Sequence, residues 1–189
     1  VWHEYLAADL GISTSNSLSG GTNYAYGGAR INNATGASTG VLNQYDQYTA
    51  GPGAGGADSD ALYIAWAGGN DMRDLVGSGN PQPTIDSIIG NFQSMLSDLL
   101  FGGAMTVIVP NLPNLGAIPE FAPTANAGSA TFVTESWNAA LDNMVNDLSS
   151  QYSDATIVQL DIFGFFTETL ANPEAFGYTN TTGTCRSLG

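Results

Sequence analysis

Hydrophobic residues follow two different patterns along this chain. Short, mainly apolar stretches, typical of buried strands, occupy 61–67 (ALYIAWA, continuously apolar), 104–110 (AMTVIVP) and 155–161 (ATIVQLD). Residues 84–101 and 129–151 instead place apolar side chains every three or four positions, which predicts amphipathic helices. Because buried strands alternate with amphipathic helices, the sequence predicts an α/β fold with a parallel sheet that helices cover on both faces.

The remaining segments are shorter or less regular. Residues 1–10 repeat apolar side chains at helical spacing and predict a helix, with its expected start before the first residue. The stretch TNYAY at 22–26 is rich in β-forming residues and predicts a strand. Residues 29–60 are rich in Gly, Asn, Ser and Thr, and predict a long loop that lines or covers a site. A short helix that ends before Pro173 is predicted after the last strand.

Charge narrows the range of partners. The 189 residues include no lysine, and the net charge is −14 with a pI near 4.1. A nucleic-acid backbone binds clustered Lys and Arg, and an anionic membrane surface repels so acidic a chain, so both partners are excluded. A lysine-free surface of neutral polar side chains favours export, and we expect a secreted or cell-surface protein. No apolar stretch reaches the length of a membrane span.

The ends of the predicted strands carry the candidate chemistry. The glycine pair 27–28, the sequence GGND at 68–71 and Asn111 each follow a strand. Ligands of parallel sheets bind beyond the carboxyl ends of the strands. Glycine lets a substrate approach backbone N–H groups closely, and an Asn side chain adds a donor, so these residues suit an oxyanion hole for acyl transfer. The alternative interpretation is that GGND is an ordinary turn.

Two other features do not predict a site. The sequence GASTG at 36–40 matches the G-x-S-x-G pattern, but no buried strand precedes it, so Ser38 is not predicted to be a nucleophile. His3 is the only histidine and is expected on the surface of the first helix. With one histidine and Cys185 as the only cysteine, the sequence offers no transition-metal site.

Several stretches together resemble the SGNH/GDSL hydrolases. They are VWHEYLAADLG (1–11), GGTNYAYGGAR (20–30), ALYIAWAGGND (61–71), VIVPNLPNLGAIP (107–119) and DIFGFFTETLANPEAFGYTN (161–180). They occur in family order, in the pattern of the long lipase and esterase branch that includes phospholipase/lecithinase-like and autotransporter esterases. The resemblance implies one SGNH hydrolase domain over 1–189, folded as a flavodoxin-like three-layer α/β/α sandwich. It also implies a serine esterase or lipase that needs no cofactor and acts on a small-molecule or lipid ester.

The same resemblance implies roles for individual residues. Gly28 corresponds to the glycine that donates its backbone N–H to the oxyanion, with Gly27 as the alternative in this glycine pair. Asn70 corresponds to the asparagine that donates from its side-chain amide, and Asp71 is expected to support the turn that holds it.

Two family segments are expected outside this sequence. The Gly-Asp-Ser-Leu segment with the nucleophile would precede residue 1, and the Asp-x-x-His segment would follow Cys185, so the domain is expected to be truncated at both ends and to lack its first strand. In the strand order 2-1-3-4-5, residues 22–26 and 61–67 would flank that strand and would not pair with each other. Cys185 is expected to pair with a cysteine in the following segment, in an oxidising compartment.

Two other interpretations of this chain remain open at this point. One is a catalytically inactive SGNH module that serves as a carbohydrate- or surface-binding domain. The other is a segment of an ordinary enzyme whose catalytic residues lie in its flanking sequence. The sequence does not distinguish lipid, short-chain ester, thioester or acetylated-sugar substrates.

Overall fold

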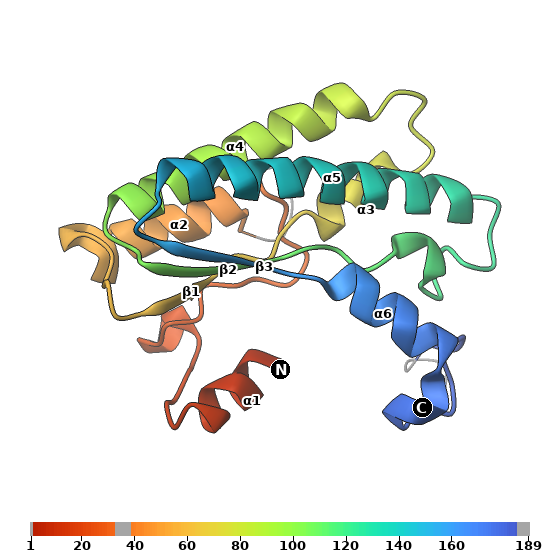
Figure 1. Ribbon diagram of the computed structural model, residues 1–189, viewed down its shortest axis with the longest axis horizontal. Helices are drawn as coiled ribbons and strands as arrows, with labels where there is room; N and C mark the ends of the chain where they lie inside the picture. The colour runs from red at the N-terminus through yellow and green to blue at the C-terminus, as the bar shows by residue number, and fades with distance from the viewer. Residues whose placement is uncertain (1, 33–38, 185–189) are drawn as a thin grey trace.

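The computed structural model describes residues 2–32 and 39–184, and it combines helices with a parallel sheet (Figure 1). The helices are α1 (Trp2–Asp9), α2 (Val41–Thr49), α3 (Gly69–Leu75), α4 (Gln82–Phe101), α5 (Ala127–Gln151) and α6 (Ile162–Ala171). The strands are β1 (Leu62–Ile64), β2 (Thr106–Pro110) and β3 (Thr156–Leu160). Short 3-10 turns occupy η1 (Ser17–Ser19), η2 (Pro52–Gly55), η3 (Leu115–Ala117) and η4 (Pro173–Phe176).

The sheet confirms the predicted α/β fold. Its strands are parallel and adjacent in the order β1-β2-β3, with Ile64, Ile108 and Val158 aligned across it. Helices α3 and α4 connect β1 to β2, and α5 connects β2 to β3, because parallel neighbours require a crossover that returns the chain to the same end. The carboxyl ends of all three strands therefore meet at one edge of the sheet.

The two faces of the sheet are covered differently. Helices α2, α4 and α5 lie over one face (Figure 1), where Val107 and Val109 belong to the core. This core also contains Phe92 and Trp137, whose rings are tilted by 32° with their centroids 6.5 Å apart. Each such large buried side chain contributes about 1.5–3 kcal/mol. The opposite face, on the side of α1, carries the half-exposed apolar residues Leu62, Val158 and Leu160. Strand residues alternate between faces, so the sequence pattern sets which side chains enter the core.

The strand predicted at 22–26 is wrong. This segment forms only a single parallel bridge, between Asn16 and Asn23. The Asn23 side chain accepts the backbone N–H of Ala25 at 3.0 Å, which turns the chain before a ladder extends. The segment therefore passes beside the sheet as a loop that leads to the glycine pair.

The long loop predicted at 29–60 is also interrupted, because it contains α2. Val41, Leu42, Tyr45 and Tyr48 recur at helical spacing on this element and pack against the core. The turn proposed for GGND is a helix start instead, since α3 begins at Gly69.

Candidate active site

The glycine pair forms a tight turn. The N–H of Ala29 donates to the carbonyl of Tyr26 at 3.2 Å, and Gly28 has φ +80°, the left-handed region that glycine adopts without steric cost. Gly27 lies outside that region, so only Gly28 is required to be glycine by its backbone. Within the described residues the N–H of Gly28 has no hydrogen-bond acceptor. This N–H is therefore available to a ligand.

The backbone of Gly68 contacts the ring of Trp137, and this contact fixes the start of α3. Gly68, the N-cap residue, has φ +99°, and a Cβ placed on it would lie 2.5 Å from the indole of Trp137. Trp137 is fully buried in the core. The first turn of α3 therefore rests directly on the core, and it presents Asn70 at the carboxyl end of β1.

Asn70 lies against the turn that contains Gly28. Its side-chain Nδ2 donates to the carbonyl of Ala29 at 2.9 Å. The two residues predicted to form an oxyanion hole thus lie on adjoining segments, although they are 42 positions apart in the sequence. An amide group has two N–H bonds, so Asn70 retains a second donor for a ligand while the first holds the turn.

Two further contacts join this loop to α3. The N–H of Ile31 donates to both carboxylate oxygens of Asp71 at 3.2 Å, so Asp71 holds the neighbouring loop in addition to its own turn. The guanidinium of Arg30 donates from Nε and Nη2 to the two oxygens of Asp74, the latter at 2.8 Å. A bidentate pair of this kind fixes orientation as well as distance.

The two carboxylates differ in their electrostatics. Burial raises the pKa of Asp71, against the opposing effects of the Ile31 N–H and the Arg30 charge. The hydrogen bond from Arg30 lowers the pKa of Asp74, which lies at the surface. Asp74 therefore keeps Arg30 in place at neutral pH, close to the turn that contains Gly28.

Asn70 lies between two hollows of different character. One, of about 240 Å³, is lined by Asn70 and by the charged residues Arg30, Arg73, Asp74 and Glu120. The other, of about 290 Å³, is lined by Asn70 and mostly by small or apolar residues, including Ala25, Val41, Trp66 and Leu112. Arg73 is paired with Glu120 at 2.8 Å. A group held at Asn70 therefore meets charged side chains on one side and apolar side chains on the other.

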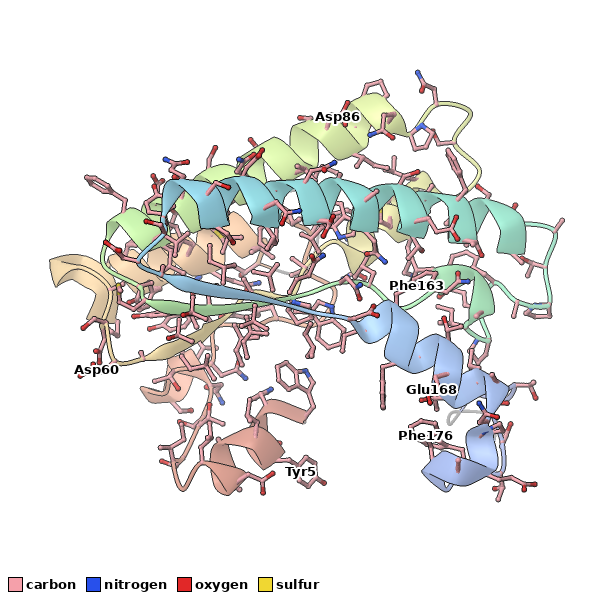
Figure 2. The ribbon with its side chains drawn as sticks, viewed as in Figure 1. Tyr5, Asp60, Asp86, Phe163, Glu168 and Phe176 are labelled. Atoms are coloured by element: carbon pink, nitrogen blue, oxygen red, sulfur yellow. The ribbon has the colours of Figure 1, made fainter. Side chains whose placement is uncertain are left out.

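Asn111, the third candidate at a strand end, binds the start of α6 and does not join Gly28 and Asn70. Its side chain donates to Asp161 at 2.9 Å and accepts a hydrogen bond from the N–H of Phe163 at 2.8 Å. Phe163 lies in the first turn of α6 (Figure 2). Its carbonyl accepts the indole N–H of Trp66 at 3.1 Å. The side chain of Asn111 thus organises the start of α6 and fixes Trp66 through the backbone, so the structure does not bring its amide to Asn70.

The other residues considered from the sequence fall outside this site. His3 exchanges a hydrogen bond with Asn23 at 3.1 Å between their side-chain nitrogens, and the neighbouring Trp2 packs edge-on against Trp66. Ser38 and Cys185 lie outside the described residues. Across residues 2–32 and 39–184, no cluster of three or more His, Cys, Asp or Glu is arranged to hold a metal ion.

Comparison of the sequence with known protein families gives one match. The model of the GDSL-like Lipase/Acylhydrolase family matches residues 1–184. The chain belongs to this family. The parallel sheet and its helices are consistent with the α/β/α fold of GDSL hydrolases.

Individual relatives of this GDSL chain align with different shares of it. It is 26% identical over 230 aligned positions to a GDSL esterase/lipase of Arabidopsis thaliana, an alignment that spans all of this chain and 62% of the relative. It is 33% identical over 125 residues to Lipase 1 of Photorhabdus luminescens, across 64% of this chain and 19% of the relative. The chain therefore spans less than two thirds of the length of either curated relative.

Proposed function

We propose that this chain is the central part of an SGNH/GDSL carboxylic ester hydrolase, with an oxyanion hole formed by the backbone N–H of Gly28 and the side-chain amide of Asn70. The observation that carries the proposal is the hydrogen bond from Asn70 to Ala29, which places the amide beside a glycine whose N–H points to no acceptor within the described residues. Both donors are fixed before a substrate arrives, as electrostatic stabilisation of a transition state requires.

The chemistry follows the acyl-enzyme route. A serine hydroxyl attacks the ester carbonyl while a histidine takes its proton, and the carbonyl oxygen becomes an oxyanion that Gly28 and Asn70 stabilise. The alcohol leaves with that proton. Water then attacks the acyl-serine, the histidine takes a proton from the water and returns it to the serine oxygen, and the acid is released. We propose that the serine and the Asp-His pair come from outside these residues, since the only histidine, His3, is bonded to Asn23.

The first prediction tests the role of Asn70 in the full-length protein. Asn70→Ala should lower kcat for a p-nitrophenyl ester by about 10²–10³ and change KM little, because the lost hydrogen bond is strongest in the transition state. Steady-state kinetics at saturating ester measure this effect.

Asn111→Ala is the matched control, because it removes the same amide from the end of the neighbouring strand. It should cost α6 stability and leave kcat within a fewfold of the parent. A normal kcat in Asn70→Ala, together with a lower melting temperature, would show that Asn70 only holds the loop. Hydrolysis absent from the parent itself would favour a binding module without catalysis.

We also propose that the protein acts outside the cell, on the basis of its lysine-free, strongly acidic composition. Within the described residues, no helix is both long enough and apolar enough to cross a membrane.

A further inference from the structure

We propose that Arg30 and Asp74 are positioning residues of this hydrolase, whose ion pair holds the turn that contains Gly28 in place on α3. Neither side chain is a donor to the oxyanion, so the pair acts on the reaction through the N–H of Gly28. The inference rests on the proposed function and adds to it the means by which one of its two donors is oriented. It is carried by the bonds that join the segment after Gly28 to α3.

Three consecutive residues after Gly28 are each bonded to α3. The contacts pair Ala29 with Asn70, Arg30 with Asp74, and Ile31 with Asp71. In each contact a donor from one segment meets an acceptor from the other, so the described residues complete all three. Because the contacts come from successive residues, the segment cannot slide along α3 unless all three break together. The segment is therefore fixed in register with the first turns of α3.

The guanidinium of Arg30 links α3 to the glycine turn itself. Its Nε and Nη2 donate to the two oxygens of Asp74, the latter at 2.8 Å, and its Nη1 donates to the carbonyl of Gly28 at 3.4 Å. The guanidinium is planar and rigid, so its bonds to a carboxylate fix its orientation as well as its distance. Only two rotatable backbone bonds separate the carbonyl of Gly28 from its N–H. A constraint on this carbonyl therefore also restricts the direction of the N–H.

The pair should matter more for turnover than for stability. The side chains of Arg30 and Asp74 are 36% and 52% exposed, and exposed ion pairs contribute little to folding. Catalysis is far more sensitive to position, because a displacement of about 1 Å can lower a rate by about 10². A loss of the pair that leaves the fold intact should therefore still lower kcat.

A second ion pair on α3 provides the matched comparison. Arg73 binds Glu120 at 2.8 Å, and their side chains are 47% and 46% exposed. This pair resembles the first in chemistry, exposure and helix, but it joins α3 to the segment after η3 and not to the turn that contains Gly28. Its loss should therefore affect stability to the same small extent without changing the N–H of Gly28.

The experiment measures kcat and KM of the full-length enzyme on p-nitrophenyl acetate. Asp74→Asn should lower kcat about tenfold and leave KM within about twofold, because the N–H of Gly28 is misdirected and not removed. Glu120→Gln should leave both constants within about twofold of the parent, and the melting temperatures of the two variants should be nearly equal.

A double-mutant cycle tests whether the two residues act as one pair in the full-length enzyme. Arg30→Gln should lower kcat about as much as Asp74→Asn, and the double variant should be no slower than either, since each change breaks the same pair. The inference is overturned if the two effects multiply, if Asp74→Asn keeps the kcat of the parent, or if Glu120→Gln lowers kcat equally. If the parent hydrolyses no ester, the proposed function fails instead, which is a distinguishable result.

Discussion

At the scale of single residues, position 68 requires glycine for two reasons. Its backbone conformation and its contact with Trp137 both exclude a side chain. Gly68→Ala should lower the free energy of unfolding by about 2–5 kcal/mol, from the left-handed backbone and the overpacked ring together. Gly77→Ala is the matched control: Gly77 has φ +82° but nothing within 4 Å of the added Cβ. It should cost only about 1–2 kcal/mol. Urea denaturation of both variants checks the difference, and equal losses would show that the contact with Trp137 is not limiting.

The candidate site was partly predictable at this scale. Gly28 and Asn70 could be singled out because glycine and asparagine at strand ends suit an oxyanion hole, and the structure brings them to adjoining segments. Their assignment as catalytic groups stays a prediction. Asn111 shows the same sequence signal, yet its side chain organises α6. Which strand-end amide faces which neighbour depends on where the next helix begins, and a linear pattern does not contain that information.

At the scale of elements, the predicted helices are confirmed where the apolar pattern repeats over many residues. Residues 84–101 and 129–151 correspond to α4 and α5, which begin within a few residues of the expected positions. The prediction of a strand at 22–26 was wrong. β propensity reflects packing against neighbouring strands, and this segment makes only one β-bridge. Helix α2 was missed because its apolar residues lie within a loop that is otherwise rich in glycine and polar side chains.

The start of α6 gives a prediction about pH. Asp161 is its N-cap, and hydrogen bonds from the N–H of Gly164 and the side chain of Asn111 lower the pKa of its carboxyl. Because the folded pKa is below the unfolded one, this carboxylate stabilises the protein at neutral pH, and the contribution is lost as the pH falls through the folded pKa. Asp161→Ala should cost about 1 kcal/mol at pH 7 and less at pH about 3.

The control for this element is Asp161→Asn, which keeps a capping side chain that does not titrate. The stability of Asp161→Asn relative to Asp161→Ala should stay nearly constant with pH, whereas the advantage of the parent over Asp161→Ala should shrink in acid. Urea denaturation at a series of pH values measures both differences. An advantage of the parent that grows as the pH falls would mean that the sign of the pKa shift is wrong.

At the scale of the whole molecule, the parallel sheet collects residues from distant parts of the sequence at one edge. The turn at Gly28, the start of α3 after β1 and the segment after β2 meet around Asn70, and α2 contributes Val41 to the same hollow. The core of α4, α5 and the sheet supports this edge through the contact between Trp137 and Gly68. The site thus belongs to no single motif, which is why its two hollows could not be predicted from the sequence.

Net charge is the other property of the whole molecule, and it leads to the last prediction. At −14 the folded chain repels itself, and Arg30 and Arg73 are already paired with Asp74 and Glu120. Salt at about 0.15 M shortens the Debye length to about 8 Å and screens this repulsion, while exposed ion pairs of about 0–1 kcal/mol lose little. The melting temperature should therefore rise by several degrees between about 0.01 and 0.15 M NaCl. A variant with the exposed Asp46, Asp142 and Asp147 changed to Asn should melt higher in low salt and depend less on NaCl. A melting temperature that falls with salt in both proteins would show that ion pairs, and not self-repulsion, dominate the electrostatics of the folded state.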